Sequence, residues 1–238
     1  MNLKLEHISA QSIVYDADRI QCPDPRIFHP DWWQEVGQVA GKASGRGDTL
    51  FLDGPLGPAV LRPYLRGGLA SRVSYDGYLY TGLQRSRPFR EVRLLAWLSK
   101  RSLPVPRPLA GLCDRRGLIY RGALLMQRIL PAEPLADLIG RLPPTHPAWP
   151  AIGRCIRRFH DAGVVHADLN ARNILVQGEG TIYLIDFDRA RISHRSQRMS
   201  RASLERLSRS LGKCWPSAQA GLRQSCWARL IQGYNTPL

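Results

Sequence analysis

Lysine and long apolar runs are scarce in this sequence. Lys4, Lys42, Lys100 and Lys213 are its only lysines, and no apolar run approaches the roughly 18 to 20 residues that a membrane-spanning helix needs. Residues 1–7 lack the basic and then apolar pattern of a secretory signal peptide. The five cysteines are odd in number and have no metal-site spacing, which predicts reduced thiols in the cytoplasm and no zinc site.

Acidic residues are also few. The chain has 19 Asp and Glu against 34 Lys and Arg, for a formal net charge of +15, and 34 − 4 leaves 30 arginines. Such a positive field attracts anionic lipid, nucleic acid or phosphorylated substrates. A generally basic surface and a surface for an anionic partner both remain open. No nucleic-acid-binding motif accompanies the charge, so specific nucleic-acid recognition is not predicted.

The most informative stretch is residues 165–176, with the sequence VHADLNARNILV. Asp168 and Asn173 stand five residues apart in it, and Asp186 follows further along the chain. This order is typical of protein-kinase-like phosphotransferases. Asp168 is the predicted carboxylate that orients the attacking hydroxyl and accepts its proton, and Asn173 with Asp186 would bind Mg²⁺ on ATP. The motif therefore predicts ATP-dependent phosphoryl transfer.

The surrounding elements support this interpretation. Runs 174–176 and 181–185 are β-type and are joined by a glycine turn, which predicts a hairpin with Asn173 before one strand and Asp186 after the other. A helix ending near Gly163 is expected upstream. Its apolar stripe has the spacing i, i+3, i+4, i+7, with Ile152, Cys155, Ile156 and Phe159.

A glycine-rich segment precedes the strand-like residues 49–52. It contains Gly45, Arg46 and Gly47, whose backbone N–H groups are predicted to cover ATP phosphates, because glycine permits close approach. The segment does not match G-x-G-x-x-G, so a plain hairpin loop is an alternative interpretation.

Residues 59–62, AVLR, resemble the V-A-I-K strand whose lysine holds ATP phosphates. Here Arg62 supplies the charge and a planar fork that suits phosphate oxygens. A helix is expected near residues 88–99, and its Glu91 is the predicted partner of Arg62. The alternative is that Glu91 is a surface residue among basic neighbours.

A proline-rich segment, residues 103–108, ends that helix. Two strands are expected next, at residues 109–112 and 118–127. The backbone at Gln127 and Arg128 is predicted to bind adenine, at the place of a kinase hinge. The motifs together predict an α+β, protein-kinase-like fold in two lobes that form one kinase-like domain: a β-rich N-lobe of residues 1–128 and a reduced, mainly helical C-lobe of residues 129–238.

Departures from protein kinases are concentrated after Ala167, which replaces the Arg of the kinase loop. Asn170 stands where serine/threonine kinases carry a Lys, so Arg172 is the predicted cation for the moving phosphate, with Arg189 as the second candidate. Asp188 replaces a Gly and is a predicted extra metal contact.

The region after Asp188 is short for a protein kinase. Only 50 residues follow Asp188, without an A-P-E motif, which argues against a regulated protein kinase. His166 is expected to pack beneath Asp186, and a role in proton transfer is the alternative. The stripe of Leu204, Leu207 and Leu211 is expected to pack in the core, and contact with a membrane is the alternative.

Several stretches resemble the 3-deoxy-D-manno-octulosonic acid (Kdo) kinases. The resemblance runs from about residue 28 to residue 213, and its more specific parts are an Arg-Gly-Gly and a Tyr-Leu-Tyr-Thr-Gly sequence. The stretches are residues 60–69, 77–82, 89–91, 103–108, 165–176, 185–189 and 204–211.

The resemblance implies phosphorylation by ATP of the 4-hydroxyl of Kdo in a Kdo-lipid A precursor, at the cytoplasmic face of the bacterial inner membrane. The implied partners are this acceptor and the anionic membrane surface, with no specific nucleic acid and no protein partner. The acceptor is expected near residues 66–68, Arg189 and Arg191. A heptose kinase, a pseudokinase, an antibiotic phosphotransferase and a nucleic-acid-binding protein are the alternatives.

Overall fold

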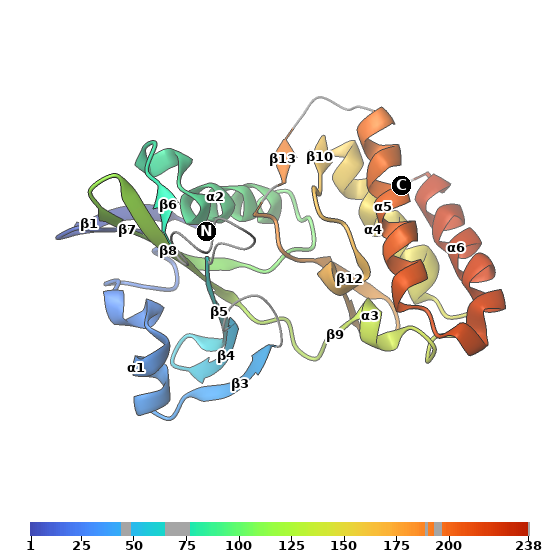
Figure 1. Ribbon diagram of the computed structural model, residues 1–238, viewed down its shortest axis with the longest axis horizontal. Helices are drawn as coiled ribbons and strands as arrows, with labels where there is room; N and C mark the ends of the chain where they lie inside the picture. The colour runs from blue at the N-terminus through green and yellow to red at the C-terminus, as the bar shows by residue number, and fades with distance from the viewer. Residues whose placement is uncertain (44–48, 65–76, 189, 193–196, 238) are drawn as a thin grey trace. The chain divides into compact units, whose positions relative to one another are not determined.

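The computed structural model describes residues 1–43, 49–64, 77–188, 190–192 and 197–237. The chain divides into two compact units (Figure 1). Unit 1 comprises residues 1–101 and 106–129, and unit 2 comprises residues 102–105 and 130–238.

Unit 1 is built on one antiparallel sheet. Within the described residues its strand order is β1-β2-β7-β8-β5-β4-β3, and β6 also pairs with β8. The helix α2 (Arg87–Ser99) packs against β7 and β8, as Figure 1 shows. The strands are β1 (Leu3–Ile8), β2 (Gln11–Asp16), β3 (Val39–Ala43), β4 (Thr49–Gly54), β5 (Gly57–Pro63), β6 (Tyr78–Leu79), β7 (Pro108–Arg116) and β8 (Ile119–Gln127).

A hydrophobic cluster covers one face of this sheet. Strand side chains such as Leu50 and Leu61 pack there with Phe28 of η1 (Pro25–Phe28) and Trp33 of α1 (Pro30–Glu35). Because successive strand residues point to opposite faces, Arg62 is directed away from this cluster. The sheet alternation thus presents Arg62 to α2. The short helix η3 (Leu83–Arg85) leads into α2.

A buried ion pair joins two distant parts of unit 1. Asp16 at the end of β2 is fully buried, and its Oδ2 accepts a hydrogen bond from Arg107 Nε at 2.8 Å. The other carboxylate oxygen accepts the backbone N–H of Asn2 at 3.0 Å. Arg107 Nη2 also binds Oδ2, and the backbone N–H of Asp18 donates to Oδ1 at 3.3 Å. Four donors therefore compensate the desolvated charge.

Unit 2 combines short hairpins with three longer helices in its described part: α4 (Ala148–Asp161), α5 (Gln197–Cys214) and α6 (Ala220–Asn235). The hairpin of β11 (Ile174–Gln177) and β12 (Thr181–Leu184) also pairs with β9 (Glu133–Pro134). A second small sheet joins β10 (Val164–Val165) to β13 (Arg191–Ile192). The remaining elements are α3 (Leu135–Leu138), η4 (Ala171–Asn173) and η5 (Ser217–Gln219).

Helices α4 and α6 approach closely because glycine stands at their contact. A Cβ atom on Gly153 would lie 2.0 Å from the Leu230 carbonyl oxygen, and one on Gly233 would lie 2.1 Å from that of Pro150. Both distances are far inside van der Waals contact, so these two positions require glycine. Tyr234 adds a polar contact between the same helices, since its hydroxyl lies 2.9 Å from His160 Nδ1.

The structure confirms the predicted α+β composition and several predicted elements. The 174–185 hairpin is present, and α4 buries its predicted stripe. Leu207 and Leu211 of α5 are buried, as expected for core packing. The turn between the strands expected at residues 109–112 and 118–127 is shorter than those bounds imply, because β7 continues to Arg116. No helix in the described ranges combines the length and apolarity that crossing a bilayer requires.

Candidate functional site

Glu91 is the centre of a polar cluster in unit 1. Arg62 Nη2 lies 2.5 Å from Glu91 Oε2, and the Tyr64 hydroxyl donates to the same oxygen at 2.6 Å. The Glu91 side chain is 1% exposed, whereas that of Arg62 is 19% exposed. The predicted ion pair is therefore present, and the alternative of Glu91 as a surface residue is wrong.

Tyr64 is the member of this cluster that the sequence did not single out as a site residue. Burial, and then the neighbouring Glu91 carboxylate, raise the pKa of the Tyr64 hydroxyl well above its usual range. The hydroxyl therefore stays protonated and acts as a donor to Glu91. The Cζ atom of Arg62 also lies 5.1 Å from the centre of the Tyr64 ring. Tyr64 thus holds the Glu91 carboxylate in place, and that carboxylate orients the Arg62 guanidinium.

The predicted adenine-binding segment uses its backbone N–H groups within unit 1. The N–H of Gln127 donates to the Arg107 carbonyl at 2.8 Å, and that of Arg128 donates to the Pro58 carbonyl at 2.9 Å. The Arg128 guanidinium lies 4.0 Å from the centre of the Phe51 ring. A backbone contact to adenine at these two residues would therefore have to use a carbonyl oxygen, and adenine binding here stays a prediction.

Several predicted positions lie outside the described residues. They are Gly45, Arg46 and Gly47, residues 66–68, and Arg189. The side chain of Arg191 is also outside the described part.

In unit 2, the side-chain amide of Asn170 organises the loop from Asp168 to Asn173, which is the predicted catalytic loop. Its Oδ1 accepts the backbone N–H groups of Arg172 at 2.9 Å and Asn173 at 3.2 Å, which caps the short helix η4. Its Nδ2 donates to the carbonyl of Asp168 at 3.0 Å. These bonds explain why an amide stands where many kinases have a lysine: the side chain shapes the loop and contributes no charge to it.

His166 lies beneath the loop, as predicted. Its Nδ1 accepts the N–H of Asp168 at 3.2 Å, so Nε2 carries the proton and donates to the Ile185 carbonyl at 2.8 Å. The ring packs edge-on against Phe187 at 4.8 Å between centroids. Burial lowers the pKa of His166, which favours this neutral tautomer.

Two hydrogen bonds join Asn173 to Asp168 and to Ile185, the residue before Asp186. Asn173 Nδ2 donates to the Asp168 carbonyl at 2.9 Å, and the N–H of Ile185 donates to the Asn173 carbonyl at 3.0 Å. Asp186 follows directly, with φ at +64°, a backbone conformation that costs energy for a residue with a side chain. Three sequence-predicted residues are therefore brought together by the hairpin and the loop.

The donor set suits magnesium on phosphate. Mg²⁺ is usually held by one or two carboxylates together with phosphate oxygens and water. Asp186 and Asp188 are partly exposed, and the Asn173 amide donates through Nδ2, which leaves its Oδ1 for an ion. In the described part of the chain no three His, Cys, Asp or Glu residues form a metal cluster, so an all-protein cage is absent there.

Asp168 has an arginine neighbour that sequence reasoning did not identify. Arg206 of α5 places its Nη1 4.0 Å from Asp168 Oδ1. One helical turn later, Ser210 Oγ accepts the N–H of Ala171 at 3.0 Å. Arg172, the predicted cation, is exposed, and among the described residues only Arg206 is within ion-pair distance of Asp168. The role of Arg172 stays a prediction.

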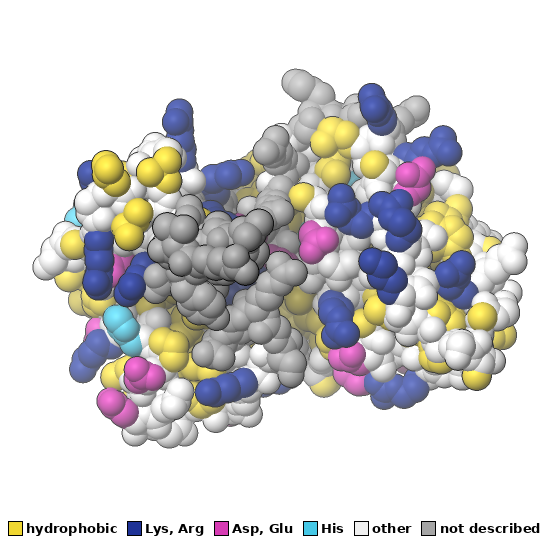
Figure 2. Space-filling model, in the orientation of Figure 1, with side chains coloured by type: hydrophobic (Ala, Val, Ile, Leu, Met, Phe, Trp, Pro, Cys, Tyr) yellow, Lys and Arg dark blue, Asp and Glu magenta, His cyan; other side chains and the backbone are white. Residues whose placement is uncertain are grey.

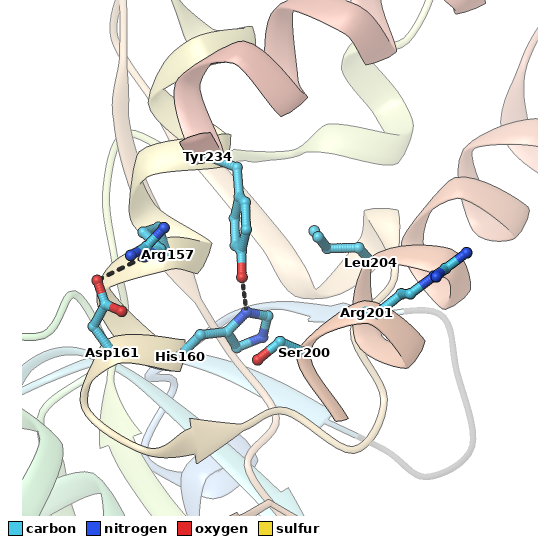
Figure 3. A pocket seen from close by; sticks show the side chains of 7 residues that line it. All are labelled: Arg157, His160, Asp161, Ser200, Arg201, Leu204 and Tyr234. Carbon is cyan, nitrogen blue, oxygen red and sulfur yellow. Dashed lines mark hydrogen bonds and ion pairs between the residues drawn. The ribbon is translucent and has the colours of Figure 1, made fainter. Parts of the chain in front are cut away.

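A separate pocket of about 670 Å³ lies among α4, α5 and α6 (Figure 3). Its lining includes the hydrogen-bonded His160 and Tyr234, together with Arg201 near the start of α5. Both its arginines already have acidic partners, Asp161 for Arg157 and Glu205 for Arg201. The residues that line it include no member of the catalytic loop, so we do not assign it to phosphoryl transfer.

Comparison with known proteins gives a consistent result. Residues 30–234 match the model of the lipopolysaccharide kinase (Kdo/WaaP) family. The chain is 43% identical to a 3-deoxy-D-manno-octulosonic acid kinase of Stenotrophomonas maltophilia (strain R551-3), over 94% of this chain and 89% of the relative. It is 48% identical to one of Xanthomonas oryzae pv. oryzae (strain PXO99A), over 85% and 80%. The chain therefore belongs to the lipopolysaccharide kinase (Kdo/WaaP) family.

Proposed function

We propose that this protein is a Kdo kinase, which phosphorylates Kdo with ATP during synthesis of the lipopolysaccharide core. The observation that carries the proposal is the pair of hydrogen bonds that joins Asn173 to Asp168 and to Ile185, the residue before Asp186, in a chain of this family. The relatives named above are 3-deoxy-D-manno-octulosonic acid kinases. The finer proposal is that the acceptor is a Kdo-lipid A precursor, that its 4-hydroxyl reacts, and that the protein has a kinase-like two-lobed fold.

Asp168 would act on the acceptor hydroxyl. Its side chain is 59% exposed, so an acceptor can reach it. As the hydroxyl oxygen forms its bond to the γ-phosphorus, Asp168 takes the hydroxyl proton. The bond from that phosphorus to the bridging oxygen breaks, and ADP leaves with that oxygen. Positioning and charge stabilisation would provide most of the acceleration.

The remaining residues would bind the nucleotide. Arg62, held by Glu91 and Tyr64, binds the phosphates that stay with ADP, because its guanidinium suits phosphate oxygens. Asn173 and Asp186 would hold Mg²⁺, with Asp188 as an extra ligand. The ion, when bound, neutralises charge on the phosphates. Arg172 would approach the transferred group.

An anionic membrane surface is the proposed second partner. In unit 1, Leu118 is 77% and Leu79 is 63% exposed, and Leu79 pairs across the strands with the exposed Ile119. Arg115 and Arg116 stand beside them on β7, and we call these five residues the hairpin tip. Figure 2 shows hydrophobic and basic side chains close together in this region. Apolar residues flanked by arginines suit the interface of an anionic bilayer.

The function is tested by mass spectrometry of a Kdo-lipid A precursor incubated with the protein, ATP and Mg²⁺. One added phosphate on the Kdo fragment is expected, and the Asp168→Asn variant should yield no more than about a hundredth of it. NMR of the product identifies the hydroxyl. If ATP binds and no acceptor is phosphorylated, the protein is a pseudokinase. Phosphate only on a heptosylated core would make it a heptose kinase.

The membrane surface is tested by sedimentation with vesicles of phosphatidylglycerol or of phosphatidylcholine alone. Binding to the anionic vesicles is expected to fall about tenfold when Leu79 and Leu118 are both replaced by Gln. Leu222→Gln is the matched control, since Leu222 is 45% exposed on α6. Equal binding by all three proteins would show that the hairpin tip does not contact lipid.

A further inference from the structure

Helix α5 touches the catalytic loop at two positions one helical turn apart. Ser210 accepts the N–H of Ala171, and Arg206 lies 4.0 Å from Asp168. Positions i and i+4 share one face of a helix. The Ser210 bond therefore sets how α5 lies along the loop, and this places Arg206 beside the carboxylate that would bind the acceptor hydroxyl.

Arg206 is available to a ligand in this position. A separation of 4.0 Å is longer than a hydrogen bond. The two side chains are 51% and 59% exposed, and such an open ion pair contributes little to stability. In the described part of the chain, the Arg206 guanidinium makes no hydrogen bond to another protein group. Its fork of N–H donors can therefore bind a planar anion that reaches Asp168.

The surroundings of Arg206 are strongly basic. The sequence of α5 carries four arginines and one lysine against a single acidic residue, Glu205. Figure 2 shows Lys and Arg side chains gathered over α5. An anionic acceptor is therefore attracted to the side of Asp168 where α5 lies.

A sugar acid presents a particular problem to a catalytic carboxylate. Its hydroxyl must approach Asp168 while its own carboxylate carries the same charge, and two like charges repel at short range. An arginine beside Asp168 removes this repulsion, and its fork matches a carboxylate in a bidentate way. We propose that Arg206 binds the carboxylate of the acceptor sugar while Asp168 binds its hydroxyl, so that the pair selects acidic over neutral sugars. This assignment rests on the proposed function.

The test compares two acceptors, a Kdo-lipid A precursor and the same molecule with its Kdo carboxylate converted to a carboxamide. We expect wild-type protein to prefer the acid by roughly 10- to 100-fold in kcat/KM, as for other hydrogen bonds between charged groups. Arg206→Gln should reduce this preference to about threefold or less, mostly through a higher KM for the acid. Arg206→Lys should retain part of it, because the charge remains.

Arg201→Gln is the matched control. It removes the same charge from the same helix, but five residues correspond to about 140° of rotation, so Arg201 points elsewhere. Figure 3 shows it beside the α4–α6 pocket. The Arg201→Gln variant should prefer the acid over the amide by the same factor as the wild-type protein. If the amide is not turned over, its inhibition constant against the acid replaces KM in each comparison.

The outcomes separate the two proposals. Wild-type protein that phosphorylates no Kdo acceptor would overturn the proposed function and this assignment with it. Wild-type turnover combined with an unchanged acid preference in Arg206→Gln would overturn only the assignment. So would an equal loss on acid and amide, which would instead indicate that Arg206 acts on the transferred phosphoryl group.

Discussion

The Tyr64 hydroxyl donates a hydrogen bond of 2.6 Å to Glu91 Oε2, the same carboxylate oxygen that binds Arg62. The buried Glu91 charge is thus shared by a neutral donor and a cation. Losing one partner of a buried charge costs more than the hydrogen bond itself, because the charge stays desolvated. Tyr64 is therefore expected to position Arg62 without touching the nucleotide.

Tyr64→Phe tests that role. The ring stays buried and only the donor is lost, so kcat/KM for ATP should fall about tenfold. The control is Tyr80→Phe, since Tyr80 contributes its ring to a contact with Tyr120 and should tolerate loss of its hydroxyl. Steady-state kinetics at saturating acceptor make the comparison. Equal kinetics for both variants would remove Tyr64 from the phosphate-binding group.

Ser210→Ala tests the contact between α5 and the loop. The N–H of the buried Ala171 loses its acceptor, so the loop should lose its fixed position and kcat should fall about tenfold. Steady-state kinetics at saturating ATP and acceptor measure this change in kcat.

Two further variants complete that experiment. Ser210→Thr keeps a hydroxyl and should restore most of the turnover. Ser208→Ala removes a hydroxyl from the same helix, but Ser208 lines a small pocket together with Arg223 and Trp227 of α6. This variant should leave kcat unchanged. Loss of turnover in Ser208→Ala as well would indicate a general effect on α5.

Acid should destabilise the protein through His160. Burial lowers its pKa from 6.5 to about 4, so the unfolded chain binds a proton that the folded chain excludes. The stability is therefore complete above pH 6.5 and is lost as the pH falls from 6.5 toward 4. Between pH 7 and pH 5 the free energy of unfolding should fall by about 2 kcal/mol from this residue.

Urea unfolding at several pH values measures this effect. His160→Gln removes the titrating group and can still bond to Tyr234, so its stability should change less between pH 7 and pH 5. The lowered pKa of His166 acts in the same direction in both proteins and cancels in the difference. Parallel pH curves for wild type and variant would show that His160 does not titrate in this way.

The contact of α4 with α6 should not tolerate a larger residue. Gly153→Ala would place a methyl group 2.0 Å from the Leu230 carbonyl oxygen, and the forced separation should cost about 1 to 3 kcal/mol of stability. Gly221→Ala is the control within α6, because nothing lies within 4 Å of its added Cβ. It should stabilise the helix by up to about 1 kcal/mol. Chemical denaturation would distinguish the two, and equal stabilities would contradict the close approach.

Local patterns were enough to predict much of unit 2. The 3.6-residue stripe of α4 and the glycine turn of the β11–β12 hairpin depend on neighbours in the sequence. The spacing of Asp168, Asn173 and Asp186 follows from those elements, so the motif and its approximate geometry were predictable. The same holds for Arg62 and Glu91, because strand alternation and one helix bring them together.

Other features depend on contacts between distant residues. No local pattern pairs Asp16 with Arg107, or Tyr64 with Glu91, because no periodicity relates residues so far apart. The sequence also could not show that the backbone N–H groups of Gln127 and Arg128, in the predicted adenine-binding segment, already have carbonyl partners within unit 1.

Residue types at fixed spacing are enough to predict a phosphotransferase loop from the sequence. Which group stands beside the predicted catalytic carboxylate depends on tertiary packing. Arg206 and Ser210 reach the loop from a helix more than 30 residues away in the sequence, because the buried stripe of α5 fixes which face turns toward it.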